Sequence, residues 1–217
     1  LAVAYQLKEK YREAMKYVQQ AIELDPDQVS ARLMLGDLYL QVGDNFNAVD
    51  TYKETIKKFP KSVEPYLRLV NIYESFQEYK KAVELYKQIL EQEPNNLIAL
   101  NNLAFINAEL GGDLDYSLDL AQKAMKIAPE NSSVIDTLGW VFYKKGIYSK
   151  AITLFQSSLE KPENKKVLVP RIYYHLGLAL LKDSKRDEAK KAFEKSISFG
   201  TNHPDYSDAK KVLDEIK

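Results

Sequence analysis

Two histidines are the side chains best suited to acid–base chemistry in this chain of 217 residues, which contains no cysteine. Asp136 and His175 could act as an acid–base pair if the fold brought them together, whereas His203 precedes Pro204 and is interpreted as a loop or capping residue. No serine lies in a glycine-flanked nucleophile turn, and no glycine-rich phosphate loop or paired-histidine metal motif occurs. Because nothing supplies a nucleophile or an oxyanion site, we expect no enzyme activity, no cofactor and no metal.

The net charge and the hydropathy of the sequence limit the kinds of partner that we expect. The 31 basic and 31 acidic side chains balance, whereas a nucleic-acid-binding protein normally carries an excess of Lys and Arg on one face. No apolar run approaches the roughly 18 residues that span a bilayer. We therefore expect no nucleic-acid partner and no direct membrane insertion of this chain. The cellular compartment stays open, because the sequence begins at Leu1 and a targeting segment could lie upstream.

Any site in this chain must be positioned by helices. The sequence repeats every 34 residues, and within each repeat the apolar residues have the spacing of an α-helix. Three residue types recur 34 residues apart, namely Tyr5, Tyr39 and Tyr73, then Ala14, Ala48 and Ala82, and also Pro26, Pro60 and Pro94. Within a unit, apolar residues are spaced by three and four, as in Leu35, Leu38 and Val42. Each unit breaks near its middle, for example at Gly43-Asp44 or Gln77-Glu78, and again after its proline. The pattern predicts two antiparallel helices per unit.

These units resemble the tetratricopeptide repeat. Leu35-Gly36, Tyr39, Ala48, Tyr52 and Pro60 match its pattern, as do Leu138-Gly139, Phe142, Ala151 and Phe155. Four positions depart from it: Val70 and Ala104 replace the helix-contact glycine, Asn107 replaces the packing aromatic residue, and Ser117 replaces the alanine. Asn101 through Trp140 is similar to a bacterial subgroup that includes adaptors and envelope-associated scaffolds.

The resemblance implies an all-α fold, a right-handed α-solenoid that forms a single domain over residues 1–217. We expect about six repeats, at 1–26 (truncated), 27–60, 61–94, 95–129, 130–163 and 164–201, with a capping helix over 205–217. The longest connection is expected at Lys161–Pro170. Because Leu1 corresponds to a point inside a first helix, the amino-terminal end is expected to be uncapped and to offer a surface for homo-oligomerisation.

In such a solenoid the first helices of successive repeats line the concave groove, and the groove is where partners bind. We therefore predict a partner-binding surface made of Arg68, Asn71, Asn101, Asn102, Phe105, Asp136, Trp140 and Tyr174. Phe105 and Trp140 occupy equivalent points of adjacent repeats, so they either anchor a ligand or stiffen the inner curve as packing wedges. The asparagine amides could bond a peptide backbone.

Two functions are compatible with the sequence. The first is a scaffold or adaptor whose groove binds a peptide segment, in an extended or a helical form, and the second is a self-assembly module that uses the solenoid ends and edges. One family ligand, the acidic carboxyl terminus of heat-shock chaperones, is not expected, because Leu67, Ser133 and Thr137 stand where cationic side chains would be needed.

Overall fold

The described chain is helical throughout. The structure is a computed structural model that describes residues 1–161 and 168–216, and these residues form thirteen helices and no strand. They divide into two compact units, residues 1–94 (unit 1) and 95–217 (unit 2), and each is described by itself below. The expectation of one domain over 1–217 therefore stays a prediction. Most of the long connection expected at 161–170 lies outside the described residues.

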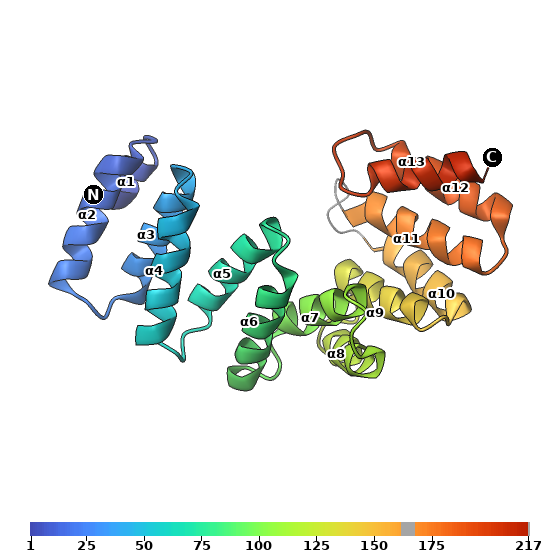
Figure 1. Cartoon of the computed structure of the whole chain (residues 1–217), viewed down its shortest axis with the longest axis horizontal. Coiled ribbons are helices and arrows are strands. Elements are labelled where there is room, and N and C mark those ends of the chain that lie inside the picture. Colours follow the sequence, from blue (N-terminus) through green and yellow to red (C-terminus); the bar gives the residue numbers. More distant parts are fainter. Residues whose placement is uncertain (162–167, 217) are drawn as a thin grey trace. The chain divides into compact units, whose positions relative to one another are not determined.

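Unit 1 contains three helical hairpins in succession (Figure 1). Its helices are α1 (Ala2–Gln6), α2 (Tyr11–Leu24), α3 (Val29–Gln41), α4 (Asn45–Lys58), α5 (Glu64–Ser75) and α6 (Tyr79–Gln92). Each helix packs on the next one along the chain, as expected for stacked hairpins joined by short loops.

Unit 2 continues the pattern and ends with an additional helix (Figure 1). Its helices are α7 (Leu97–Glu109), α8 (Leu114–Ile127), α9 (Ser132–Lys144), α10 (Tyr148–Leu159), α11 (Leu168–Lys182), α12 (Arg186–Ile197) and α13 (Tyr206–Glu215). The predicted capping helix is α13, which packs on α12 and buries Ala209 and Leu213. The opposite side of α13 is polar and faces solvent, which suits a terminal helix.

The helix ends follow from local sequence. Asp44, Asn96 and Asn131 each precede a helix and accept a hydrogen bond from the backbone N–H three residues on, at 3.0–3.1 Å. Inside the hairpins the chain turns through a left-handed residue, for which glycine is best suited, as at Gly43, Gly111 and Gly146. Three other turns place a side-chain-bearing residue in this conformation: Glu9, Gln77 and Ser184.

The repeat glycine allows two helices of a hairpin to touch. A Cβ atom at Gly36 would lie 2.5 Å from the Tyr52 ring, and one at Gly139 would lie 2.7 Å from the Phe155 ring. Real Cβ atoms do not approach so closely, so the aromatic ring occupies the place of a side chain. Repeat 3 has Val70 instead of glycine, yet its ring remains in the core, since Tyr86 is also fully buried.

Two departures in repeat 4 compensate for each other. Asn107, in place of the packing aromatic residue, donates from Nδ2 to the Ser117 hydroxyl at 2.7 Å and to the Asp113 carbonyl at 2.8 Å. Ser117, in place of the alanine, is fully buried. Because a buried hydroxyl needs a hydrogen-bond partner, the two substitutions form one polar contact between α7 and α8.

Candidate partner-binding face

The first helices of successive repeats in unit 2 lie next to one another, with α9 in contact with both α7 and α11. This arrangement brings six predicted site residues onto neighbouring helices: Asn101, Asn102 and Phe105 on α7, Asp136 and Trp140 on α9, and Tyr174 on α11. We call the surface that these three helices share the α7–α9–α11 face. Its side chains differ widely in how accessible they are.

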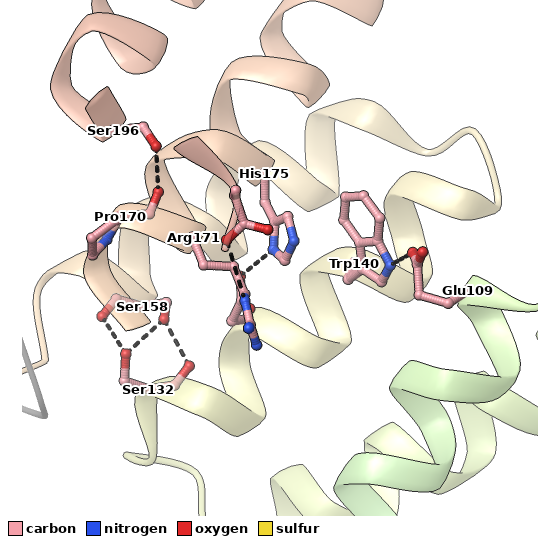
Figure 2. Close-up of polar contacts among 10 residues, drawn as sticks. Glu109, Ser132, Trp140, Ser158, Pro170, Arg171, His175 and Ser196 are labelled. Atoms are coloured by element: carbon pink, nitrogen blue, oxygen red, sulfur yellow. Dashed lines mark hydrogen bonds and ion pairs between the residues drawn. The ribbon is translucent and has the colours of Figure 1, made fainter. Parts of the chain in front are cut away.

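Trp140 belongs to the core. Its side chain is only 5% exposed, its ring stacks on His175 with centroids 4.1 Å apart, and Tyr143 lies 4.8 Å away. The indole N–H donates to the Glu109 carboxylate at 2.5 Å, as Figure 2 shows. The sequence-based expectation of an indole offered to a ligand disagrees with this burial. Of the two alternatives for Trp140, the packing role agrees with the structure, because its neighbours cover the ring.

Asp136 and His175 do meet, across the boundary between repeats 5 and 6. The His175 Nδ1 lies 2.9 Å from the Asp136 Oδ1, and each side chain is only 4% exposed. A polar pair so far from water is stable only when its members bond each other. The pair therefore ties α11 to α9, and Asp136 is not available to a ligand.

Phe105 and Tyr174 are the half-buried aromatic residues of the predicted set. The Phe105 ring centroid lies 6.1 Å from those of Trp140 and His175, and the Tyr174 centroid lies 6.1 Å from that of His175. Both rings thus rest on the buried Trp140–His175 layer and keep one part accessible. Rings held in this way lose little rotamer entropy when a partner covers them.

The Tyr174 hydroxyl is a stable hydrogen-bond donor. Burial raises the pKa of Tyr174 to about 12, with further contributions from the carboxylates of Asp208 and Asp205. The phenol therefore stays protonated at neutral pH, and its hydroxyl keeps a proton that can be donated in a hydrogen bond.

The two adjacent asparagines differ in accessibility. Asn101 is buried, and its Nδ2 donates to the Asn102 Oδ1 at 3.1 Å. The Asn101 Oδ1 is also covered and accepts no hydrogen bond from the described residues. Asn102 is partly accessible, so it is the asparagine of this pair that a ligand can reach.

The remaining predicted residues, Arg68 and Asn71, lie in unit 1 on α5, so the predicted set is divided between the two units. Arg68 is about half exposed and pairs with Asp37 at 3.6 Å, and Asn71 is exposed. Sequence reasoning missed Glu109, which follows Phe105 by one helical turn. That spacing was the available signal, since residues four apart share a helix face.

Family comparisons agree with this architecture. Models described as tetratricopeptide repeat match residues 1–63, 43–104 and 170–199. The human mitochondrial import receptor subunit TOM70 is 27% identical over 160 residues, which cover 70% of this chain and 26% of that protein. The peroxisomal targeting signal receptor of Saccharomyces cerevisiae is 24% identical over 198 residues, or 88% of this chain and 32% of that protein.

Among solved structures, the crystal structure of the APC/C hetero-tetramer Cut9-Hcn1 matches with a TM-score of 0.75 at 16% identity, over 99% of this chain and 41% of that chain. The chain belongs to the tetratricopeptide repeat family, and its fold is an all-α solenoid of helical hairpins. It spans about a third or less of the length of the curated relatives that it matches. Because these relatives include both bacterial and eukaryotic proteins, the bacterial subgroup stays a prediction.

Two other kinds of feature concern residues 1–161 and 168–216, which the structure describes. None of their helices is both long enough and apolar enough to cross a membrane. No group of three or more metal-ligating side chains gathers among them.

Proposed function

We propose that this chain is a non-enzymatic interaction scaffold that binds a peptide segment of a partner protein on the α7–α9–α11 face. The observation that carries the proposal is the pair of half-buried rings, Phe105 and Tyr174, supported from beneath by the buried Trp140–His175 stack. Preorganised aromatic side chains with an accessible edge are good anchors for an apolar ligand residue. Asn102 lies beside them with a partly accessible amide.

The relatives support a role in protein binding. TOM70 and the yeast peroxisomal protein are both named as receptors, for mitochondrial import and for a peroxisomal targeting signal. A repeat fold fixes a surface but not a ligand, so these partners are not carried over to this chain. In the proposal Asp136, Asn101 and Trp140 position the face, and contacts with the ligand come from Asn102, Phe105 and Tyr174.

The test is a selection of peptides from a random phage-displayed library on the immobilised chain, followed by calorimetry. Removing both rings, with Phe105→Ala and Tyr174→Ala, should weaken the selected peptides about tenfold or more, since anchor truncation commonly costs over 1.4 kcal/mol. Phe46→Ala is the matched control, because Phe46 is a highly exposed ring in unit 1. Unchanged affinity in the double variant, with an intact helical circular dichroism spectrum, would contradict the proposal.

Self-assembly is the second candidate, and one observation favours it. The side chains of Leu1, Val3 and Leu7, on and beside α1, are 59–83% exposed. Analytical ultracentrifugation of the chain with Val3→Ser and Leu7→Ser, beside the ring double variant, separates the two functions. Loss of oligomers in the first variant, with normal peptide binding, favours assembly through α1. A wild-type chain that stays monomeric at all concentrations contradicts it.

A further inference from the structure

A surface cavity in unit 1 has the chemistry of a second binding site. It has a volume of about 440 Å³ and lies among α4, α5 and α6. Its apolar lining consists of Ile56, Leu69, Tyr73 and Leu85. Three lysines stand around it: Lys53, Lys80 and Lys81. A cavity of this size with an apolar floor and a few charged groups is typical of ligand sites.

Unit 2 contains the same cavity at equivalent repeat positions. That cavity measures about 490 Å³, and its lining residues Leu138, Phe142 and Leu154 lie 69 residues after Leu69, Tyr73 and Leu85. The helix pairing of the repeat thus creates the cavity, independently of the charges around it. The unit 2 cavity serves as an internal reference for the one in unit 1.

The two cavities share one lysine and differ at three charged positions, because Glu84 of unit 1 also has an uncharged counterpart, Thr153, in unit 2. Lys81 lies over the Tyr73 ring at 5.1 Å, and its counterpart Lys150 lies over the Phe142 ring at 5.2 Å. A cation over a ring is therefore part of the common architecture. The other two lysines, Lys53 and Lys80, correspond to the uncharged Gln122 and Ser149.

The lining of the unit 1 cavity contains three lysines and one carboxylate, so its net charge is positive. Lys81 pairs with Glu78, and the one acidic residue of the lining, Glu84, pairs with Lys87 at 3.0 Å. Neither Lys53 nor Lys80 forms an ion pair with any residue in the described part of the chain. Two exposed ammonium groups thus flank an apolar cavity. This surface is complementary to a ligand that has an apolar group next to negative charges.

We propose that this cavity binds an acidic segment of a partner protein, with one large apolar side chain in the cavity and flanking carboxylates at Lys53 and Lys80. An apolar floor of two leucines, an isoleucine and a tyrosine suits an aliphatic or aromatic side chain. The proposal is independent of the α7–α9–α11 face, because every residue that carries it lies in unit 1.

The probe is an acetylated peptide of sequence Gly-Asp-Glu-Phe-Leu-Asp-Glu-Gly, titrated into the full 217-residue chain with methyl-labelled Ile and Leu. Methyl resonances of Ile56, Leu69 and Leu85 should shift, while those around the unit 2 cavity should shift less. A twin peptide with amides in place of all carboxylates, and another with Ser in place of Phe and Leu, should each bind more weakly. Equal binding of either twin would overturn the proposal.

Two pairs of substitutions then test the lysines directly. Lys53→Gln with Lys80→Gln should weaken the acidic peptide about threefold to tenfold at low ionic strength, with a smaller difference in high salt. Both lysines are exposed, so the fold should be retained. The reverse exchange in unit 2, Gln122→Lys with Ser149→Lys, should increase the shifts around Leu138 and Leu154. Unchanged affinity in the first variant, or binding of single-stranded RNA in preference to the peptide, would contradict the inference.

Discussion

Unit 1 and unit 2 fill the same inter-repeat contact with different chemistry. The residue after the helix-contact position of one repeat meets the residue two before that position in the next repeat. In unit 1 this contact is Asp37 with Arg68, a 3.6 Å ion pair whose side chains are 30% and 49% exposed. In unit 2 it is Trp140 with His175, two rings 4.1 Å apart that are both buried.

The difference shows that the repeat determines which positions come into contact. The side chains at these positions determine whether the contact is exposed to solvent or buried. Arg and Asp carry charges that remain near water, so the α3–α5 contact stays partly exposed. Trp140 and His175 exclude water, and their polar atoms are then bonded by Glu109 and Asp136. A buried layer of this kind holds the half-buried rings of the α7–α9–α11 face in place.

Removing His175 should give the largest effect. His175→Ala leaves the buried Asp136 carboxyl group without its partner, and we expect a loss of about 3–5 kcal/mol in the free energy of unfolding. Arg68→Ala, at the equivalent contact of unit 1, should cost about 0–1 kcal/mol, because an exposed ion pair contributes little. Urea denaturation monitored by circular dichroism measures both.

A double-mutant cycle sharpens this contrast. Asp136→Ala combined with His175→Ala should reveal a coupling of about 1.5–3 kcal/mol, against less than about 1 kcal/mol for Asp37→Ala with Arg68→Ala. Similar couplings in the two cycles would mean that burial does not distinguish the contacts, and the contrast between the units would fail.

Repeat 4 provides a test of intermediate size. Asn107→Ala removes the hydrogen bonds to Ser117 and to the Asp113 carbonyl, so we expect a loss of about 1–2 kcal/mol. Asn71→Ala is the control, because Asn71 is exposed and should change stability by less than about 0.5 kcal/mol. Thermal unfolding of both variants measures the difference. Equal melting temperatures would show that the Asn107 contacts add no stability.

The smallest expected effect depends on pH and concerns the polar contacts of unit 1. Burial raises the pKa of Glu74, and a hydrogen bond from the Tyr86 hydroxyl at 2.8 Å partly offsets this. A raised folded-state pKa means that Glu74 favours folding when protonated, so its contribution is lost as pH rises through its folded-state pKa.

Glu74→Gln keeps a hydrogen-bond acceptor and removes the charge. The variant should therefore be more stable than the wild type by a few tenths of a kcal/mol at neutral pH and about equal to it near pH 3. Urea titrations at the two pH values measure this. A variant that loses stability on going from low to neutral pH as the wild type does would contradict the prediction.

The fold followed from the sequence because its signals are local and repeated. The 34-residue period, the polar caps and the turn residues predicted the hairpins and the terminal helix. The burial of Trp140 could not be predicted in the same way, because it depends on His175 and Glu109, which come from two other helices. The Asn107–Ser117 contact was equally hidden, since each residue by itself looks like a defect in the pattern.

The candidate site was predicted only in outline. Repeat positions gave the helices that carry the α7–α9–α11 face, but the structure was needed to separate partly accessible side chains such as Phe105 from buried ones such as Asp136. The lysine-lined cavity was not predicted, because it forms between side chains of three helices and becomes distinctive only beside its uncharged counterpart.

The Asp136–His175 pair has a consequence for how a single chain folds. Hairpins that resemble one another can stack on a wrong neighbour, which is a characteristic misfolding route of repeat proteins. The Asp136 carboxyl group and the His175 imidazole are both buried and bond each other. We expect any wrong stacking of repeats 5 and 6 to be destabilised, because it would leave these buried polar groups without a partner. We expect the pair to favour the correct pairing of these two hairpins, so that variants lacking it misfold more often during refolding.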